Sequence, residues 1–382
     1  MSLRTKLVGI IMVLAVGLAF FAFYANRSVE ETVKIGYIGP LTGNAAVLGE
    51  DAVKSIRLAV DEVNARGGVD GRKVKLFVED DQYDTKQSVA AYNKLVHVDG
   101  VDTLIMSTYG GVFAVAEQSE KDGVLIVDPL DCDTAFSEAP ATVFCIAKET
   151  EDLGFVIADY AADSGKQAPA VLHATVDQFM PSVGTAFEKR FEERTGGSVT
   201  VASYAPGTTD FRSILLPLKN ADAIVWLGYD EIGLAMKQAR ELGIDAEFLS
   251  VPSVATSAEV ERAAAGSAEG MKFSFYTASS ANEQNAIFRR KFESIYGAPP
   301  VLPIVSDQTY DAMQILLTEV FPSIKENSGK ERTGSVIAKL LGVKDYRGVT
   351  GTLTMTPGKR ISGIALVLFE LKNGAPVPFE SR

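Results

Sequence analysis

Residues 33–43, VKIGYIGPLTG, decide the fold class of this chain. The alternating segment VKIGYI is typical of a strand, and residues 39–43, GPLTG, have the glycines and the proline of a turn. Apolar side chains at helical spacing come next, namely Val53, Ile56, Val60 and Val63. Gly67 and Gly68 then allow this helix to end in a left-handed cap. The segment therefore predicts one strand–turn–helix unit.

The same unit repeats along the chain in two series. The first series continues with strands at 73–79, 102–107 and 124–128 and helices at 86–96 and 112–121. The second begins after Gly165, with strands at 168–174, 198–204, 223–228, 247–251 and 271–276 and helices at 182–196, 211–219 and 231–243. Residues 282–341 are mostly helical in pattern, and the last 40 or so residues resemble hairpin strands. We predict an α/β protein with two Rossmann-like lobes, and a ligand site beyond the carboxyl ends of the strands.

Charge excludes one class of partner. The chain has 382 residues, enough for one large domain or two ordinary ones, and a net charge of −12. Residues 1–28 contain basic residues and no acidic one, so the rest of the chain is more acidic still. A body this acidic, without a basic stripe, is repelled by phosphate backbones. Nucleic acid is therefore excluded as a partner.

Cysteine and histidine are too scarce for a metal centre. The two histidines, His97 and His173, are far apart in sequence, and the two cysteines, Cys132 and Cys145, do not form a CxxC pair. We predict no metal and no cofactor. The cysteines flank a short segment between two predicted strands. They either form a disulfide, if the body is exported, or lie buried as small apolar residues.

An apolar run without charged side chains covers residues 7–25, LVGIIMVLAVGLAFFAFYA, and Arg4 and Lys6 precede it. As a helix it spans roughly 28 Å, about the hydrocarbon core of a bilayer. Cleavage at its end would place Phe23 where a signal peptidase site has a small residue. We predict an uncleaved signal anchor, with a cleaved signal peptide as the alternative. In both cases the acidic body lies outside the cytoplasmic membrane.

Catalytic motifs are missing from the sequence. No G-x-G-x-x-G follows a predicted strand, and neither G-x-x-x-x-G-K-[ST] nor G-x-S-x-G occurs. Three carboxylates do cluster in residues 128–133, DPLDCD, directly after a predicted strand. They lie in a solvated loop, contact a ligand, or act as an acid/base pair, which would require shifted pKa values. We predict that the protein is not an enzyme.

A series of short motifs resembles the type I periplasmic binding proteins and, more narrowly, the branched-chain amino-acid binding proteins of ABC importers. The motifs occur in order at residues 39–43 (GPLTG), 63–71 (VNARGGVDG), 79–81 (EDD), 238–243 (QARELG), 266–270 (GSAEG), 310–312 (YDA) and 348–351 (GVTG). The resemblance covers residues 33–377. It implies two lobes joined by three hinge strands, here preceded by the N-terminal apolar helix within residues 1–28.

The resemblance also implies a division of the chain. The hinge strands would cross between lobes near Lys148, Tyr276 and Leu353. Lobe 1 would then comprise residues 32–147 plus 277–352, and lobe 2 residues 148–276 plus 353–382. Members of this family close around a small ligand and present the closed form to a membrane permease.

Residues carried over from the family place a ligand site at both lobes. In lobe 1, Tyr109 lies where relatives hold a ligand carboxylate with serine, beside Ser107 and Thr108. The last two side chains either contact the ligand or cap the helix that follows. In the next loop, Cys132 occupies a threonine position and Leu130 a position for a small residue. Tyr109 itself, like the aromatics below, is either a ligand contact or an ordinary core side chain.

The lobe 2 half departs further from the amino-acid pattern. Phe179 replaces one tyrosine, Tyr229 retains a second, and Pro252 replaces the glutamate that pairs with the ligand's ammonium group. A buried ammonium requires such a partner. We therefore predict that an ordinary branched-chain amino acid is not the preferred ligand, unless Asp131 or Asp133 supplies the missing charge.

Two functions are compatible with this sequence. The first is a solute-binding protein that delivers an amino acid, an amide or a related compound to an ABC permease. The second is a sensory ectodomain on the same fold, which would signal through a membrane partner because the chain has no cytoplasmic domain of its own.

Overall fold

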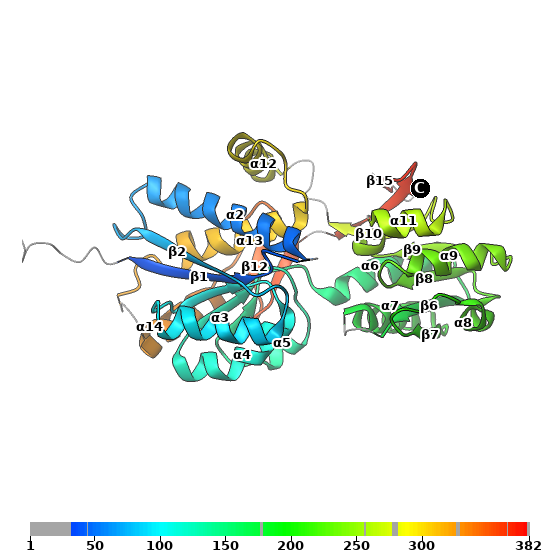
Figure 1. Cartoon of the computed structure of the whole chain (residues 1–382), viewed down its shortest axis with the longest axis horizontal. Coiled ribbons are helices and arrows are strands. Elements are labelled where there is room, and N and C mark those ends of the chain that lie inside the picture. Colours follow the sequence, from blue (N-terminus) through cyan, green and yellow to red (C-terminus); the bar gives the residue numbers. More distant parts are fainter. Residues whose placement is uncertain are drawn as a thin grey trace, which may run out of the picture.

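The computed structural model describes residues 32–43, 45–175, 179–255, 257–276, 282–325, 329–364 and 366–379. They form two lobes that lie side by side, each built around a sheet (Figure 1). The apolar run at residues 7–25, predicted to be a membrane anchor, lies outside the described residues. Within the ranges given above, no helix is long and apolar enough to cross a membrane.

The first lobe contains a parallel sheet in the order β2-β1-β3-β4-β5. Its strands are β1 (Val33–Gly39), β2 (Val74–Asp80), β3 (Thr103–Met106), β4 (Leu125–Asp128) and β5 (Val143–Cys145). Helices α2 (Ala46–Ala65) and α13 (Pro303–Gln314) pack against each other on one face, and α3 (Thr85–His97) and α4 (Tyr109–Asp122) cover the other. Each face buries its own apolar cluster, as a parallel sheet requires.

The helical stretch predicted at residues 282–341 returns to this first lobe. It comprises α12 (Glu283–Tyr296), α13, a π-helix (Ile315–Val320) and α14 (Gly329–Leu341). Apolar side chains of all four contribute to the same buried cluster as β1. A short helix, α5 (Ala135–Glu138), lies in the segment between β4 and β5.

The second lobe contains a sheet in the order β15-β14-β10-β9-β8-β6-β7. Its strands are β6 (Pro169–Ala174), β7 (Thr200–Tyr204), β8 (Ala223–Leu227), β9 (Glu247–Ser250), β10 (Lys272–Tyr276), β14 (Leu366–Lys372) and β15 (Ala375–Pro378). Its helices are α6 (Thr150–Asp163), α7 (Phe179–Thr195), α8 (Arg212–Leu215), the 3₁₀ turn Leu216–Leu218, α9 (Ile232–Glu241), α10 (Pro252–Ala255) and α11 (Ala258–Ala264). The first five strands pair in parallel, and β14 and β15 add antiparallel strands at one edge.

A third, small antiparallel sheet packs with the first lobe. It consists of β11 (Tyr346–Arg347), β12 (Gly351–Met355) and β13 (Ile361–Ile364). Leu353 and Ile361 are buried in the cluster that contains β1, and a bridge joins Cys145 of β5 to Arg360. The boundaries of the two domains stay a proposal.

The carboxyl ends of both sets of parallel strands lie at the junction of the lobes. β5 leads into α6 of the second lobe, and β1, β3 and β4 run parallel to β5. After β10 the chain returns to α12 of the first lobe, and β6, β8 and β9 run parallel to β10. Each sheet therefore presents to the other lobe the edge at which open α/β sheets bind ligands.

Candidate functional site

The first half of the candidate site follows β3. Ser107 and Thr108 come directly after this strand and are 0% and 2% exposed. Thr108 is the N-cap residue of α4, yet its side chain makes no capping hydrogen bond. Among the described residues, the Thr108 hydroxyl has no hydrogen-bond partner, whereas the Ser107 hydroxyl interacts with the buried phenol of Tyr37. Buried hydroxyls are normally satisfied, so the open Thr108 hydroxyl at a strand end suggests a place for a bound group.

Tyr109 is fixed by the loop that follows β4. Its hydroxyl donates to Asp133 Oδ2 at 2.7 Å, and its ring contacts Phe113 and Phe136. Burial, and then the hydrogen bond to Asp133, raise the pKa of Tyr109, so the phenol stays protonated. The ring is half-buried, which suits a wall of the junction as well as a core contact.

The carboxylates predicted at residues 128–133 have separate tasks. Asp128 is buried, and its Oδ1 accepts the backbone N–H groups of Leu130 at 2.7 Å and Asp131 at 3.0 Å. Burial and the charge of Asp131 raise the pKa of Asp128 well above its usual value. Asp133 binds Tyr109 and also accepts the N–H of Ala135 at 2.9 Å. The hydrogen bonds of Asp128 and Asp133 therefore fix the conformation of the loop that carries Leu130 and Asp131.

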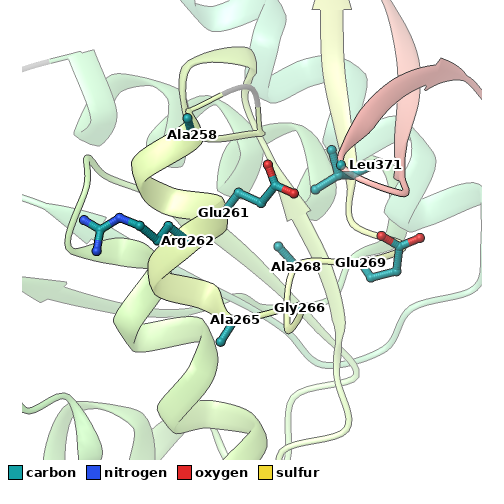
Figure 2. A pocket seen from close by; sticks show the side chains of 9 residues that line it. Ala258, Glu261, Arg262, Ala265, Gly266, Ala268, Glu269 and Leu371 are labelled. Carbon is teal, nitrogen blue, oxygen red and sulfur yellow. The ribbon is translucent and has the colours of Figure 1, made fainter.

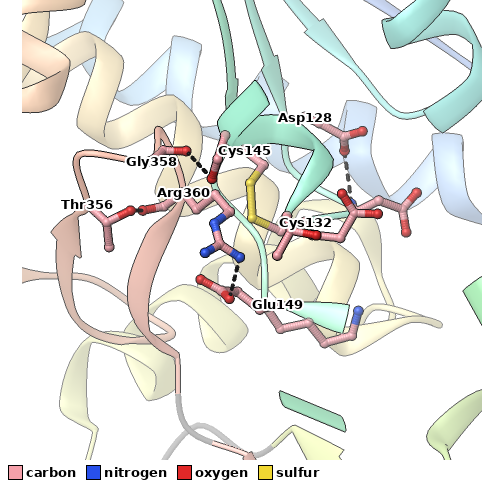
Figure 3. Close-up of a disulfide and its surroundings, with 12 residues drawn as sticks. Asp128, Cys132, Cys145, Glu149, Thr356, Gly358 and Arg360 are labelled. Atoms are coloured by element: carbon pink, nitrogen blue, oxygen red, sulfur yellow. Dashed lines mark hydrogen bonds and ion pairs between the residues drawn. A yellow bond between two sulfur atoms is a disulfide. The ribbon is translucent and has the colours of Figure 1, made fainter. Parts of the chain in front are cut away.

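The two cysteines form a disulfide, which settles the alternative left by the sequence. Cys132 and Cys145 are bonded and fully buried, with 5.5 Å between their Cα atoms (Figure 3). The bond links the loop after β4 to β5. On the far side of the bond, the Cys145 N–H donates to the carbonyl of Lys359 at 3.0 Å. Because the Cys132 sulfur is bonded, this residue positions the loop and supplies no thiol to a ligand.

Contacts with the segment that enters the second lobe lie beside the disulfide. Arg360 pairs with Glu149 at 2.7 Å, just before α6 begins (Figure 3). The Thr150 N–H, at the start of α6, donates to the carbonyl of Cys132 at 2.6 Å. The loop after β4 is thus tied to the segment through which the chain enters the second lobe.

The second half of the candidate site follows three neighbouring strands of the second lobe. Phe179 begins α7 after β6, Tyr229 follows β8, and Pro252 begins α10 after β9. Phe179 and Pro252 are partly buried, and Tyr229 is 39% exposed. Because β6, β8 and β9 are adjacent, these three residues share one edge of the sheet. None of the three is fully buried, although Phe179 packs against the apolar cluster of the second lobe.

Lys148, which the sequence analysis assigned only to a hinge, lies near the charges of the loop after β4. It lies between β5 and α6, and its backbone N–H donates to Gln308 Oε1 at 2.8 Å. Burial lowers the pKa of Lys148, while the charges of Asp131 and Asp128 oppose this. Its position near a predicted hinge crossing could have drawn attention to this basic residue. Its charged neighbours could not be predicted, because they are brought together by the tertiary fold.

Pockets elsewhere do not coincide with these residues. One, of about 310 Å³, is lined by Glu261 and Arg262 of α11, by Gly266 and Glu269, and by Leu371 of β14 (Figure 2). Residues 265–269 precede β10, so this pocket lies at the opposite edge of the sheet from the junction. Over the part of the chain that the structure describes, no group of three or more histidine, cysteine or acidic side chains could hold a metal ion.

Residues 32–375 match the family described as "Periplasmic binding protein". The chain belongs to this family. Leu/Ile/Val-binding protein homolog 2 of Brucella abortus (strain 2308) is 30% identical over 268 residues, which are 68% of this chain and 71% of that protein. The type I periplasmic binding protein fold with two lobes and parallel sheets, predicted from the sequence, is confirmed.

Two solved structures show the same fold. The first is the branched-chain amino acid transporter substrate binding protein of Streptococcus pneumoniae str. Canada MDR_19A in complex with isoleucine, with a TM-score of 0.72, 23% identity, and coverage of 90% of this chain and 97% of that one. The second is the solute binding protein of an ABC transporter from R. palustris in complex with benzoate, with a TM-score of 0.71, 20% identity, and coverage of 91% and 95%.

The family also provides information on whether the protein is a binding protein or an enzyme, and on its location in the cell. Its members here are named as binding proteins and not as enzymes, which agrees at the family level with the absence of catalytic motifs. The family is periplasmic, which agrees with the predicted position of the acidic body outside the cytoplasmic membrane.

Proposed function

We propose that this protein closes its two lobes around a small solute and delivers that solute to an ABC importer in the membrane. The observation that carries the proposal is the arrangement at the junction. Both sets of parallel strands direct their carboxyl ends there, and the first contributes the buried hydroxyls of Ser107 and Thr108, of which that of Thr108 has no partner within the described ranges. A ligand that contacts both edges favours the closed form over the open one.

The proposed ligand is an amino acid, an amide or a related compound, and not an ordinary branched-chain amino acid. Pro252 offers no charge to an ammonium group, and Asp133 already binds Tyr109 and the N–H of Ala135. Asp131, in the same loop, is the acid that we test in the role of the missing glutamate. Leucine, isoleucine and valine are the solutes in the name of the Brucella abortus relative, and benzoate occupies the R. palustris protein. The fold itself therefore does not decide the ligand.

Titration calorimetry and thermal shift on the purified body test the proposal. The panel contains leucine, isoleucine and valine, other amino acids, amides, polyamines and aromatic acids. We expect saturable binding of at least one compound, with weaker or undetectable binding of the three branched-chain amino acids. Micromolar binding of leucine, isoleucine or valine would overturn the ligand assignment, and its loss in Asp131→Asn would show that Asp131 had replaced the glutamate. No binding by any compound would overturn the solute-binding proposal itself.

The sensory alternative has no specific support. The relatives are named for binding and transport, and no feature within the described ranges favours signalling over delivery. The proposal therefore retains the importer as the partner.

A further inference from the structure

Gln308 of α13 joins two segments that the sequence analysis did not connect. Its Oε1 accepts the backbone N–H of Lys148 at 2.8 Å, and its Nε2 donates to the carbonyl of Pro129 at 3.1 Å. Lys148 lies where the chain passes from β5 of the first lobe to α6 of the second, and Pro129 belongs to the loop after β4. One side-chain amide therefore bridges this crossing and the loop that carries Leu130 and Asp131.

The bridging amide is buried, so its two bonds have no ready replacement. Gln308 is 1% exposed. A carboxamide supplies one acceptor and one donor group, which is what a backbone N–H and a carbonyl require together. An apolar side chain at this position would leave the N–H of Lys148 and the carbonyl of Pro129 without these bonds. Polar groups left unpaired inside a protein are costly.

The helix that carries this amide is anchored within the first lobe. Asp307, the preceding residue, accepts Asn285 Nδ2 at 2.9 Å and pairs with Arg289 at 2.6 Å, and both partners belong to α12. Asp311, one turn further along α13, accepts the backbone N–H of Val349 at 2.7 Å. These bonds tie α13 to α12 and to the turn before β12. The amide thus extends from a fixed point to the crossing.

Further contacts join the same two segments directly. The disulfide links Cys132 of the loop to Cys145 of β5, and the Thr150 N–H at the start of α6 donates to the carbonyl of Cys132 at 2.6 Å. The Gln308 amide adds an attachment of both segments to α13. A displacement of the loop is therefore expected to displace the crossing as well.

We propose that Gln308 is a positioning residue that makes the loop after β4 and the crossing at Lys148 move as one unit, so that a solute in contact with this loop also acts on the hinge. The proposal rests on the proposed closure of the lobes. The competing interpretation is that Gln308 only satisfies two backbone groups. That role affects stability and leaves the relative motion of the lobes unchanged.

The distance between the lobes in the solute-free protein separates the two interpretations. Spin labels at Glu117→Cys on α4 and Lys189→Cys on α7, both exposed positions, report this distance by pulsed electron paramagnetic resonance. Both native cysteines are in the disulfide, so the label attaches at the introduced cysteines. In Gln308→Met we expect a broader distance distribution than in the labelled protein without this substitution, because the crossing has lost its attachment to α13.

Gln314→Met is the matched control. Gln314 is a buried glutamine of the same helix, roughly 9 Å further along its axis. Its Nε2 donates to Glu62 Oε2 and to the Tyr310 hydroxyl, each at 2.9 Å, and both partners belong to the first lobe. Gln308→Met and Gln314→Met should both lower the melting temperature. The control should leave the distance distribution unchanged.

Amide hydrogen exchange provides a second measurement. In Gln308→Met the Lys148 N–H should exchange roughly 2- to 10-fold faster, the range for the loss of one hydrogen bond. The N–H groups of Leu130 and Asp131 should also exchange faster, and all three should keep their wild-type rates in Gln314→Met. If Gln308→Met does not fold, Gln308→Asn replaces it with the same expectations, because a side chain shorter by one methylene cannot make both bonds at once.

Three results would overturn the proposal: an unchanged distance distribution in folded Gln308→Met, equal broadening in Gln308→Met and Gln314→Met, or exchange at Lys148 that the loss of Gln308 does not affect. Each of them leaves solute binding intact, since the measurements use no solute. A protein that binds no member of the panel would overturn the proposed function, and the link between the loop and the crossing would still be measured.

Discussion

At the scale of single residues, the three carboxylates of the loop after β4 have different partners within the chain. Asp128 organises the turn, Asp133 holds the Tyr109 hydroxyl, and Asp131 acts electrostatically on Lys148. The sequence showed that three carboxylates lie close together, but not that their partners differ. Those partners come from other elements, so their identity depends on the sheet order and cannot be deduced from local spacing.

Truncation of one aromatic side chain in each lobe tests whether both halves bind the ligand. We expect Tyr109→Ala and Phe179→Ala each to weaken binding of the solute found in the panel by about 2 kcal/mol, or roughly 30-fold, because each removes a large apolar contact. Calorimetry measures the affinity, and thermal melting shows that the fold is intact. Ile295→Ala, which truncates a 59% exposed side chain on α12, is the control. Wild-type affinity in both folded aromatic variants would place the site elsewhere.

At the scale of elements, the alternating strands and helices could be predicted because each shows its own periodicity. Every strand predicted at residues 73–79, 102–107 and 124–128 overlaps one in the structure, namely β2, β3 and β4. The short strand β5 and the small sheet of β11, β12 and β13 were harder to predict from the sequence. They are defined by pairing across long sequence separations, such as the bridge from Cys145 to Arg360.

The disulfide is predicted to stabilise the protein and to order the ligand loop. Cys132 and Cys145 are separated by 13 residues, and closing a loop of this size contributes about 3 kcal/mol in the chain-entropy description. We expect the paired substitution Cys132→Ser with Cys145→Ser to lower the free energy of unfolding by that amount. Ligand affinity should fall as well, since the bond anchors the loop that carries Leu130 and Asp131. Urea denaturation and calorimetry measure the two effects.

A reductant provides the matched control for this prediction. Reduction of the wild type should reproduce the loss of stability, and the same reductant should leave the doubly substituted protein unchanged. A wild type whose unfolding midpoint is insensitive to complete reduction would show that the bond contributes nothing to stability.

At the scale of the whole molecule, the two lobes could be predicted from the two βα series, and their arrangement follows from the crossings. The site could be predicted only in part. Candidate residues at the strand ends could be predicted from the sequence, because open α/β sheets bind ligands there. The proximity of Lys148 to Asp128 and Asp131 could not be predicted, because it arises where the chain leaves one lobe for the other.

The N-terminal run at residues 7–25 is predicted to keep the protein attached to the membrane, since it is long enough to span a bilayer and lacks a suitable cleavage site. Cell fractionation should find the protein in the membrane fraction, with residues 7–25 still attached to the body. A variant without residues 1–28 but with a cleavable signal peptide should be recovered in the soluble fraction. A soluble form of the natural chain that begins near Asn26 would contradict the anchor.

Closure of the lobes on a solute is the central claim, and small-angle X-ray scattering of the purified body tests it most directly. The radius of gyration is measured without ligand and with a saturating concentration of the tightest-binding compound of the panel. Closure predicts a smaller radius of gyration with ligand, and no change in a Tyr109→Ala/Phe179→Ala variant at the same ligand concentration. An unchanged radius of gyration in the wild type, at a concentration where calorimetry shows full occupancy, would contradict the account.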